Sequence, residues 1–385
     1  MEYIKLKELS KFKLEYGSGA SAVDYNGLIR YIRITDIDEI GNLRKDKVSP
    51  SISEEKYNLS DGDLLFARSG ATSGKAFLFE KKNIIENAIF AGYMIRFSPN
   101  TDIINPKYVF YYTRSNKYLE FIELNRKAVA QPNINAKQYG ELEIPMVNLQ
   151  IQNKIVQVLN TAQSLIDKRK QQIEECDELI KSRFIEMFGN PVANEKNWKT
   201  SRMWHVAPAK AYNGKLENNL WLLNLNKVQA QTGIILEYIY GETEKIGNST
   251  NAFSEENVLY SKLRPYLNKV VIPDRKGMAT SELVPLFPNK KIIVRHFLVY
   301  LLRTDAFVAY ISEKVVGAKM PRVSMSDFRK FEVILPPINL QNQFSTFVQQ
   351  VDKQKHVLQQ SLSELEGNFN SLMQRAFKGE LFPED

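Results

Sequence analysis

The feature that most constrains this chain is that its second half repeats its first half 189 residues further along. Residues 149–155, with the sequence LQIQNKI, return as residues 338–344, with the sequence INLQNQF. At the same spacing Pro132 falls on Pro321, and Phe184 falls on Met373. This spacing is far longer than the roughly 20 to 50 residues of a solenoid or propeller repeat. The repeating unit is therefore a whole domain together with the helix that follows it.

Length, composition and charge agree with two copies of a folded unit. A chain of 385 residues predicts two or three domains. Its 43% of hydrophobic and 25% of charged residues are ordinary for globular proteins with sizeable cores. The net charge of +8 permits a polyanionic partner such as nucleic acid, although a slightly basic protein without such a partner is equally compatible. The expected long helices are nearly neutral, so a nucleic-acid surface would lie on the globular parts.

Cysteine usage and hydropathy indicate the compartment. Cys176 is the only cysteine, which excludes an internal disulfide and a thiolate metal cluster and fits a reducing cytoplasm. We expect no secretory signal sequence, and no apolar run reaches the roughly 18 residues that a membrane span requires. We therefore expect a cytoplasmic protein that does not bind a membrane.

Two stretches predict long helices. From residue 151 to about residue 188 apolar residues recur every three or four positions without Pro or Gly, and Gly189 and Pro191 then end the helix. Residues 341–378 repeat this pattern and end near Gly379. Their narrow apolar stripes favour an antiparallel coiled coil, although each helix could instead pack on its own domain. Parallel pairing is less compatible with the short link to the second domain, because the chain must return.

The expected fold class is α+β: two mixed α/β domains alternate with two long helices that pair as an antiparallel coiled coil, with an internal pseudo-twofold repeat. Apolar or turn-led runs predict strands at residues 28–34, 61–67, 220–225 and 256–260. Short buried helices are expected at residues 106–114 and 295–303. The predicted boundaries are a first domain at 1–149, a first long helix at 150–190, a second domain at 191–340, and a second long helix with a C-terminal tail at 341–385.

A glycine-rich segment, residues 70–76, is similar to a phosphate-binding loop. A Walker loop has four residues between its glycines and a Ser or Thr after the Lys, whereas this segment has three residues and Ala76. Nucleotide binding is therefore not expected. Arg68, Thr72 and Lys75 nevertheless suit contact with a DNA backbone, and a solvated hairpin is the competing interpretation.

Catalytic motifs are missing from the sequence. It contains no glycine-rich nucleoside loop after a strand and no Asn/Asp-Pro-Pro-aromatic motif of a methyltransferase. Its histidines, His205, His296 and His356, lack the spacing of a metal site. Residues 273–276 weakly resemble part of a nuclease motif, but a turn explains them better. We expect a non-catalytic chain that binds no metal and no cofactor of its own.

Two segments at matched positions, residues 127–135 and 316–324, are candidates for DNA recognition. Each is expected to be a loop between a helix and the strand that leads into a long helix. Their amide, Lys and Arg side chains can read base edges or hold phosphates, although they could instead attach the domain to the helices. Residues 262–276 form the densest basic and aromatic stretch, with a solvated surface strand as the alternative. The candidate DNA-binding residues are Arg30, Arg33, Arg68, Thr72, Lys75, Gln131, Asn133, Asn224, Lys227, Lys262, Arg264, Tyr266, Lys269, Lys319 and Arg322.

Four segments carry a resemblance to a known family. They are residues 31–37 (YIRITDI), 62–70 (GDLLFARSG), 181–189 (KSRFIEMFG) and 335–341 (LPPINLQ). Over essentially the whole chain they resemble the specificity subunit of type I restriction-modification systems. Residues 144–149 depart from the pattern because they contain one proline where a double proline is common, which affects only the local turn.

The resemblance implies two target-recognition domains, each reading one half of a bipartite sequence in double-stranded DNA, with the helices fixing the gap. It also implies two adenine-methylating modification subunits docked on the helices, and restriction/translocase subunits in the full enzyme. S-adenosylmethionine, ATP and magnesium would belong to those partners. A stand-alone DNA-binding regulator would instead bind its sequence without partners. An enzyme with an unrecognised site would methylate or cleave DNA alone.

Overall fold

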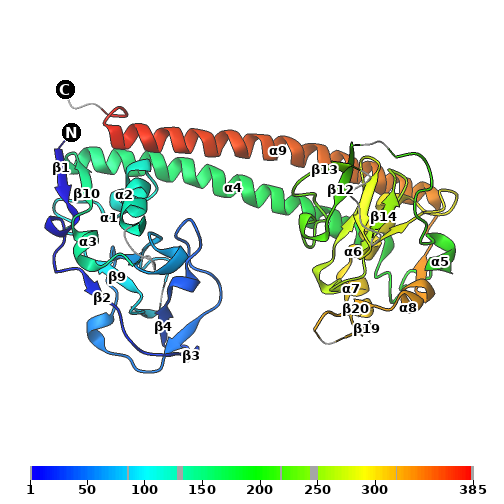
Figure 1. Ribbon diagram of the computed structural model, residues 1–385, viewed down its shortest axis with the longest axis horizontal. Helices are drawn as coiled ribbons and strands as arrows, with labels where there is room; N and C mark the ends of the chain where they lie inside the picture. The colour runs from blue at the N-terminus through cyan, green and yellow to red at the C-terminus, as the bar shows by residue number, and fades with distance from the viewer. Residues whose placement is uncertain are drawn as a thin grey trace. The chain divides into compact units, whose positions relative to one another are not determined.

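The computed structural model describes residues 2–84, 86–127, 133–216, 219–242, 250–317 and 319–382. The chain divides into two compact units (Figure 1). Unit 1 contains residues 1–169 and 361–385, and unit 2 contains residues 170–360. Two long helices, α4 (Leu149–Phe188) and α9 (Ile338–Lys378), each contribute one part to unit 1 and one part to unit 2.

Unit 1 is a mixed α/β body. Its main sheet has the strand order β2-β9-β6-β7, with antiparallel neighbours throughout. Beside it β4 pairs in parallel with β8, β3 pairs with β5, and β1 pairs with β10. The strands are β1 (Glu2–Lys5), β2 (Glu15–Tyr16), β3 (Ala22–Asp24), β4 (Ile29–Ile32), β5 (Val48–Pro50), β6 (Leu64–Ala67), β7 (Ala76–Leu78), β8 (Asn87–Phe90), β9 (Met94–Phe97) and β10 (Glu143–Met146). The helices are α1 (Pro106–Tyr112), α2 (Asn116–Lys127) and α3 (Ala136–Gly140), with short 3-10 turns at Leu6–Glu8, Ile34–Asp36, Glu55–Tyr57 and Gly70–Thr72.

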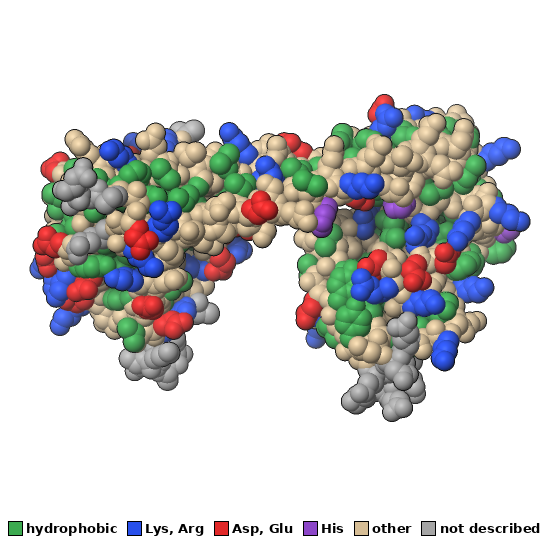
Figure 2. All heavy atoms as spheres, turned by 90° about the horizontal axis from the view of Figure 1, so that it is seen from above, with side chains coloured by type: hydrophobic (Ala, Val, Ile, Leu, Met, Phe, Trp, Pro, Cys, Tyr) green, Lys and Arg blue, Asp and Glu red, His purple; other side chains and the backbone are tan. Residues whose placement is uncertain are grey.

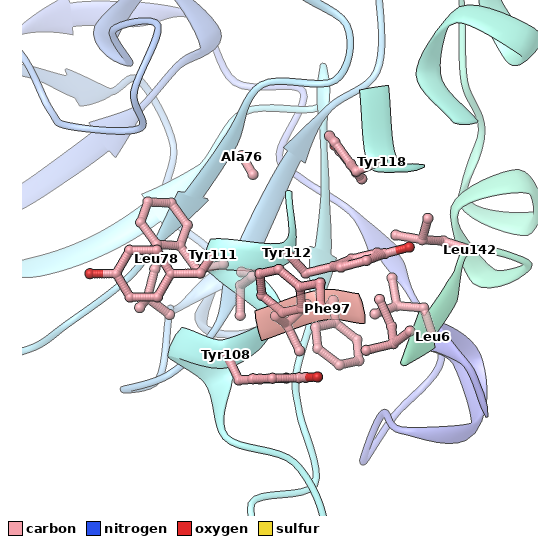
Figure 3. Packing of buried hydrophobic residues seen from close by; sticks show 14 of the residues in the cluster. Leu6, Ala76, Leu78, Phe97, Tyr108, Tyr111, Tyr112, Tyr118 and Leu142 are labelled. Carbon is pink, nitrogen blue, oxygen red and sulfur yellow. The ribbon is translucent and has the colours of Figure 1, made fainter. Parts of the chain in front are cut away.

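Helix α1 supplies the aromatic centre of the unit 1 core. Its first residue, Pro106, needs no hydrogen-bond partner for its nitrogen, and the Asn105 side chain caps the helix by accepting two backbone N–H groups. Tyr108, Tyr111 and Tyr112 from this helix are buried among side chains of the sheet and of neighbouring segments (Figure 3). Burial raises the pKa of Tyr111 to about 12, so the ring stays neutral in the core.

Unit 2 is also a mixed α/β body, with sheets that differ from those of unit 1 in strand number and order. Its sheets have the orders β13-β12-β17-β14 and β16-β15-β18, and β12 pairs in parallel with β17 as β4 does with β8. The strands are β11 (Thr200–Arg202), β12 (Asn219–Leu223), β13 (Ile239–Glu242), β14 (Thr250–Phe253), β15 (Val258–Ser261), β16 (Val270–Val271), β17 (Gly277–Thr280), β18 (Leu283–Leu286), β19 (Val315–Val316), β20 (Arg322–Val323) and β21 (Glu332–Ile334). The helices are α5 (Met203–Val206), α6 (Arg295–Arg303), α7 (Asp305–Ser312) and α8 (Met325–Lys330), with 3-10 turns at Leu225–Lys227 and Pro265–Leu267.

Each unit buries the beginning of one long helix against the end of the other. In unit 1, Ile155 near the start of α4 shares a core with Phe377 near the end of α9. In unit 2, Phe184 near the end of α4 packs on Phe344 near the start of α9, with ring centroids 5.4 Å apart. The expected long helices are confirmed, at 40 and 41 residues. No helix among the described residues has both the length and the apolar composition needed to cross a membrane.

The sequence-based prediction for the two candidate recognition segments needs a correction. In each case a short helix, α3 or α8, lies between the segment and the strand that leads to the long helix, where a direct passage from loop to strand was expected. Helix α3 forms because Asn135 and Gln138 make a reciprocal capping box. The second segment is also more regular than a loop, since β19 and β20 pair as a small hairpin.

Candidate nucleic-acid interface

The loop that follows β6 joins three segments of unit 1. The Arg68 N–H donates to the Tyr93 carbonyl at 3.0 Å, and the Arg68 carbonyl accepts from the Ile134 N–H at 2.8 Å. The Arg68 side chain also donates to the Asn133 side-chain oxygen at 3.2 Å. We call residues 68–75, 91–93 and 133–135 cluster 1.

The loop that follows β15 joins the corresponding segments of unit 2. The Lys262 N–H donates to the Glu282 carbonyl at 3.0 Å, and the Lys262 carbonyl accepts from the Val323 N–H at 2.8 Å. Glu282 and Val323 stand 189 residues after Tyr93 and Ile134. We call residues 261–268, 281–282 and 319–323 cluster 2. The two clusters therefore share one pattern of backbone hydrogen bonds.

The side chains of cluster 1 are held by partners inside the protein. The Arg68 guanidinium lies over the Tyr16 ring, 4.7 Å from its centroid. The Lys75 ammonium pairs with the Glu39 carboxylate at 2.7 Å, and the Thr72 hydroxyl donates to a backbone carbonyl at 3.2 Å. A DNA phosphate at this site would have to replace Glu39 to reach Lys75.

Arg30 and Arg33 precede cluster 1 by more than 30 residues and take no part in the contacts that define it. Arg30, on β4, is only 7% exposed and donates to the Arg44 carbonyl at 2.8 Å. Arg33 makes two hydrogen bonds to the Asp36 carboxylate, at 2.7 and 3.1 Å, and this carboxylate raises the pKa of Arg33. Both side chains support local structure in this conformation.

Cluster 2 presents cations more openly. Lys262, Arg264 and Lys319 have no ion-pair partner among the residues that the structure describes, and Arg264 and Lys319 are exposed. Arg264 and Asn268 adopt left-handed backbone conformations, with φ of 50° and 47°. Such conformations cost roughly 1 kcal/mol or more for a residue with a side chain, and they occur often at functional sites. Between them the Tyr266 ring is half exposed.

Arg322 belongs to cluster 2 and is engaged by an acidic neighbour. Its guanidinium donates from Nε and Nη2 to the Oε1 of Glu282, at 3.1 and 3.0 Å, and this contact raises the pKa of Arg322. Arg322 therefore has an intramolecular partner, unlike Arg264 and Lys319, which have no ion-pair partner among the described residues.

The remaining candidates lie elsewhere in unit 2 or outside the described residues. Lys227 pairs with Glu237, and the Lys269 ammonium donates to the Leu225 carbonyl at 2.9 Å. Burial lowers the pKa of Lys269. Asn224 is exposed at the start of the 3-10 turn that contains Lys227. Gln131 lies outside the described residues.

Two buried glutamines at the starts of the long helices were missed at the sequence level. Gln152 accepts from the Asn105 N–H at 2.8 Å and donates to the carbonyls of Ile103 and Val147 at 3.1 and 2.8 Å. Gln341 makes the same three bonds, at 2.9, 3.1 and 2.8 Å, to the residues 189 positions further on. The repeated residues of the LQIQNKI motif contained this signal, because a polar residue that returns in an apolar stripe needs buried partners.

The mixture of charges on one face and the arrangement of metal-binding residue types bear on what this chain can bind. Lys and Arg side chains alternate with Asp and Glu on the face displayed in Figure 2. Within the described ranges, no group of three or more His, Cys, Asp or Glu side chains is arranged to hold a metal ion. Recognition by this chain would therefore rest on local clusters such as those after β6 and β15.

Comparisons with known proteins identify a family. The family described as "Type I restriction modification DNA specificity domain" matches residues 1–175 and 196–367. The type I restriction enzyme EcoDI specificity subunit of Escherichia coli is 27% identical over 194 residues, which cover 48% of this chain and 42% of that protein. The type I restriction enzyme MjaVIII specificity subunit of Methanocaldococcus jannaschii is 19% identical over 369 residues, which cover 86% of this chain and 81% of that protein.

A solved structure shares the fold over the full length. The S subunit of a type I restriction-modification system from M. genitalium is 15% identical, with 100% of this chain and 96% of that chain covered and a TM-score of 0.53. At this level of identity the likeness concerns the fold alone.

Proposed function

Because this chain belongs to the type I restriction-modification DNA specificity family, we propose that it is a non-catalytic subunit that reads a bipartite sequence in double-stranded DNA for its partners. The observation that supports this most is the shared backbone arrangement of cluster 1 and cluster 2. One reading surface in each unit, on a common backbone with different side chains, suits a target in two unlike halves.

The two units are proposed as target-recognition domains, with boundaries near residues 1–149 and 191–340. In each of them a cluster combines cations with exposed amide or aromatic groups, the set that contacts phosphates and base edges. Unit 2 offers Lys262 and Arg322 at the places where unit 1 has Arg68 and Asn133, and it adds the exposed Arg264 and Lys319. Different hydrogen-bond donors on the same backbone arrangement would select different bases.

The long helices are proposed to pair as an antiparallel coiled coil that sets the gap between the half-sites and gives the chain a pseudo-twofold repeat. The support is the contact of a helix start with a helix end in both units, at Ile155 with Phe377 and at Phe184 with Phe344. The two buried glutamines fasten each helix start to its own domain, which would make the spacing rigid.

The same helices are proposed to dock two adenine-methylating modification subunits, with restriction/translocase subunits in the full enzyme. In unit 2 the paired helices leave apolar side chains exposed, Leu179 at 50% and Val357 at 62%, beside a shallow cavity of about 780 Å³. An apolar surface of this kind is typical of a protein–protein contact. S-adenosylmethionine, ATP and magnesium would act in the partners, in the cytoplasm.

Methylation mapping tests this function. The chain would be expressed with its modification subunits, and the methylated adenines of the host DNA would be mapped by long-read sequencing. We expect one bipartite motif with a fixed gap, and no methylation by the isolated chain. Methyl transfer by the chain alone, or one continuous motif, would contradict the proposal. Tight binding to one sequence without any modification subunit would favour a stand-alone regulator.

A further inference from the structure

A groove in unit 1 concentrates positive charge away from cluster 1. Its walls come from residues 40–47, from residues 77–84, from α1, and from the face of α4 between Asn160 and Asp167. Its volume is about 820 Å³. Seven of the side chains that line it are Lys or Arg, and two, Glu80 and Asp167, are carboxylates. Because these residues come from five separate segments, no local sequence pattern predicted the groove.

Two arginines form the inner wall of this groove. Arg30 is almost fully buried and donates a hydrogen bond to the Arg44 carbonyl. Arg114 lies over the Phe110 ring at 4.8 Å and donates to the Gln163 side chain at 3.2 Å. Desolvation lowers the pKa of Arg114, but a guanidinium remains charged in proteins. Neither arginine forms an ion pair with a described residue, so both keep positive charge that an anion could meet.

The rim of the groove is also short of carboxylates. Arg44 and Lys45 are exposed and have no ion-pair partner among the described residues. Lys82 and Lys107 share one carboxylate, Glu80, at 3.1 and 3.5 Å. The lining cation Lys47 pairs with Glu86 at 2.6 Å. The seven lining cations are balanced by three carboxylates: Glu80 and Asp167 in the lining, and Glu86 beside Lys47. The groove therefore has an excess of four positive charges.

We propose that this groove binds phosphate groups of the DNA backbone beside the half-site that unit 1 reads. This inference rests on the proposed function, to which it adds a contact that positions the DNA without reading its sequence. Point charges spread over a rim match successive phosphates along a strand. The free cations on the exposed segment 40–47 are accessible to such a strand. A free nucleotide carries the same phosphate chemistry, and the test separates the two sources.

Unit 2 has an acidic groove beside α4. This cavity of about 420 Å³ is lined by four carboxylates, from Glu174, Asp177, Glu178 and Asp305, and by two cations, from Lys181 and Arg303. Such a surface would repel a phosphate. This acidic groove is therefore not expected to make the phosphate contact that we propose for the basic groove of unit 1.

The test removes the two free rim charges. The Arg44→Ala/Lys45→Ala variant would be assembled with the modification subunits, and its affinity for the mapped target and for a random-sequence duplex would be measured at several salt concentrations. Each phosphate contact contributes about 0.9 to the slope of log affinity against log salt. We expect the slope to become shallower by about two contacts on both duplexes. The affinity at 0.1 M salt should fall about tenfold or more, with sequence preference unchanged.

An Arg44→Lys/Lys45→Arg variant keeps the charge and should keep the slope. The proposal is overturned if the alanine variant leaves the slope unchanged, if it alters preference at a half-site, or if the charge-keeping variant loses as much affinity. Thermal unfolding of both variants should match the parent, because both side chains are exposed. ATP titrated into the full chain without DNA should not saturate below millimolar concentration. ATP binding that the alanine variant loses would assign the groove to a free nucleotide and overturn the DNA assignment.

Failure of the proposed function would look different. The parent complex would then show no preference for a mapped sequence over random duplex. The salt slope on random duplex would still test the groove, because phosphate contacts do not depend on the sequence.

Discussion

Cluster 1 and cluster 2 have the same backbone hydrogen bonds and differ in how their cations are held. In cluster 1 the Lys75 ammonium pairs with Glu39 and the Arg68 guanidinium covers Tyr16. In cluster 2 Arg264 and Lys319 are exposed without ion-pair partners among the described residues. The backbone thus determines where a DNA contact could form. The side chains determine which intramolecular partners would have to be displaced first.

The helix interface shows the same division. Lys355 in unit 2 is buried and pairs with Asp177 at 2.5 Å, whereas the residue 189 positions earlier is Ile166, which packs in the apolar core of unit 1. The helix contact in unit 2 therefore adds one partly buried ion pair to its aromatic core, at a position where unit 1 has an apolar side chain. We expect such a pair to add little stability over an apolar pair.

The largest effect should come from the aromatic residues that end each long helix. Phe188 is fully buried, with its ring 4.8 Å from Phe297, and Phe377 at the matched place lies 5.2 Å from Tyr112. Phe188→Ala and Phe377→Ala should each lower the free energy of unfolding by about 3–5 kcal/mol, because each leaves a cavity. Urea unfolding measures this, with the exposed Ile185→Ala as the control. A loss confined to one of the two would break the equivalence of the units.

The buried glutamines give the next effect. Gln152→Leu and Gln341→Leu should each cost about 2–3 kcal/mol, because each leaves a backbone N–H and two carbonyls without partners. The exposed Gln150→Leu should change stability by less than about 0.5 kcal/mol. Urea unfolding monitored separately in the two units would show whether the losses are equal. Unequal losses would mean that the domains are fastened to their helices in different ways.

A substitution in either cluster should affect the recognition of only one half-site. Arg322→Ala is expected to weaken binding by about 1–3 kcal/mol and to broaden the sequence read at one half-site, because a forked base contact is lost. Asn133→Ala, the matched change in unit 1, should affect the other half-site. Arg322→Lys retains the charge without the fork. Binding of a panel of single-base variants at two salt concentrations measures both terms. Equal effects on both half-sites, or none, would make cluster 2 structural.

The smallest effect concerns Asp352, which faces Lys355, Asp177 and Arg303. Burial raises the pKa of Asp352 above its unfolded value, so the neutral form is favoured in the folded state. Its contribution is therefore favourable at low pH and is lost as the pH rises through the folded pKa. Asp352→Asn should give a small gain in thermal stability at pH 7 and none at pH 4. A loss at pH 7 would show that the carboxylate is needed beside Arg303.

Local sequence patterns predicted the parts of this fold that depend on local chemistry. The long helices follow from the spacing of apolar residues, and α1 and α6 were placed within two residues of their observed ends. The Asn135 cap could also have been read from the sequence, because its partner Gln138 stands three residues further on. The 189-residue spacing also identified segments that correspond between the two halves. In the structure, the backbone hydrogen bonds of cluster 1 and cluster 2 hold these segments in equivalent positions.

The state of each candidate side chain could not be predicted. Whether Lys75 is available depends on Glu39, which stands 36 residues earlier and approaches only when the unit folds. The rim of the basic groove likewise combines Arg44 with Lys107 from α1. Contacts between residues so far apart in the sequence produce no periodic residue pattern that could predict them. Residue type therefore suggests candidate contacts, but it does not indicate the intramolecular partners that compete for them.

The packing of Phe377 into unit 1 has a consequence for synthesis of the chain. Residues 1–169 leave the ribosome first, but their core lacks the aromatic side chains that α9 contributes near its end. Unit 2 can assemble once residue 360 has emerged, whereas unit 1 must wait for residues 361–378. The unit that is synthesised first is therefore completed last, and a chain that ended before residue 361 would lack the part of the unit 1 core that α9 supplies.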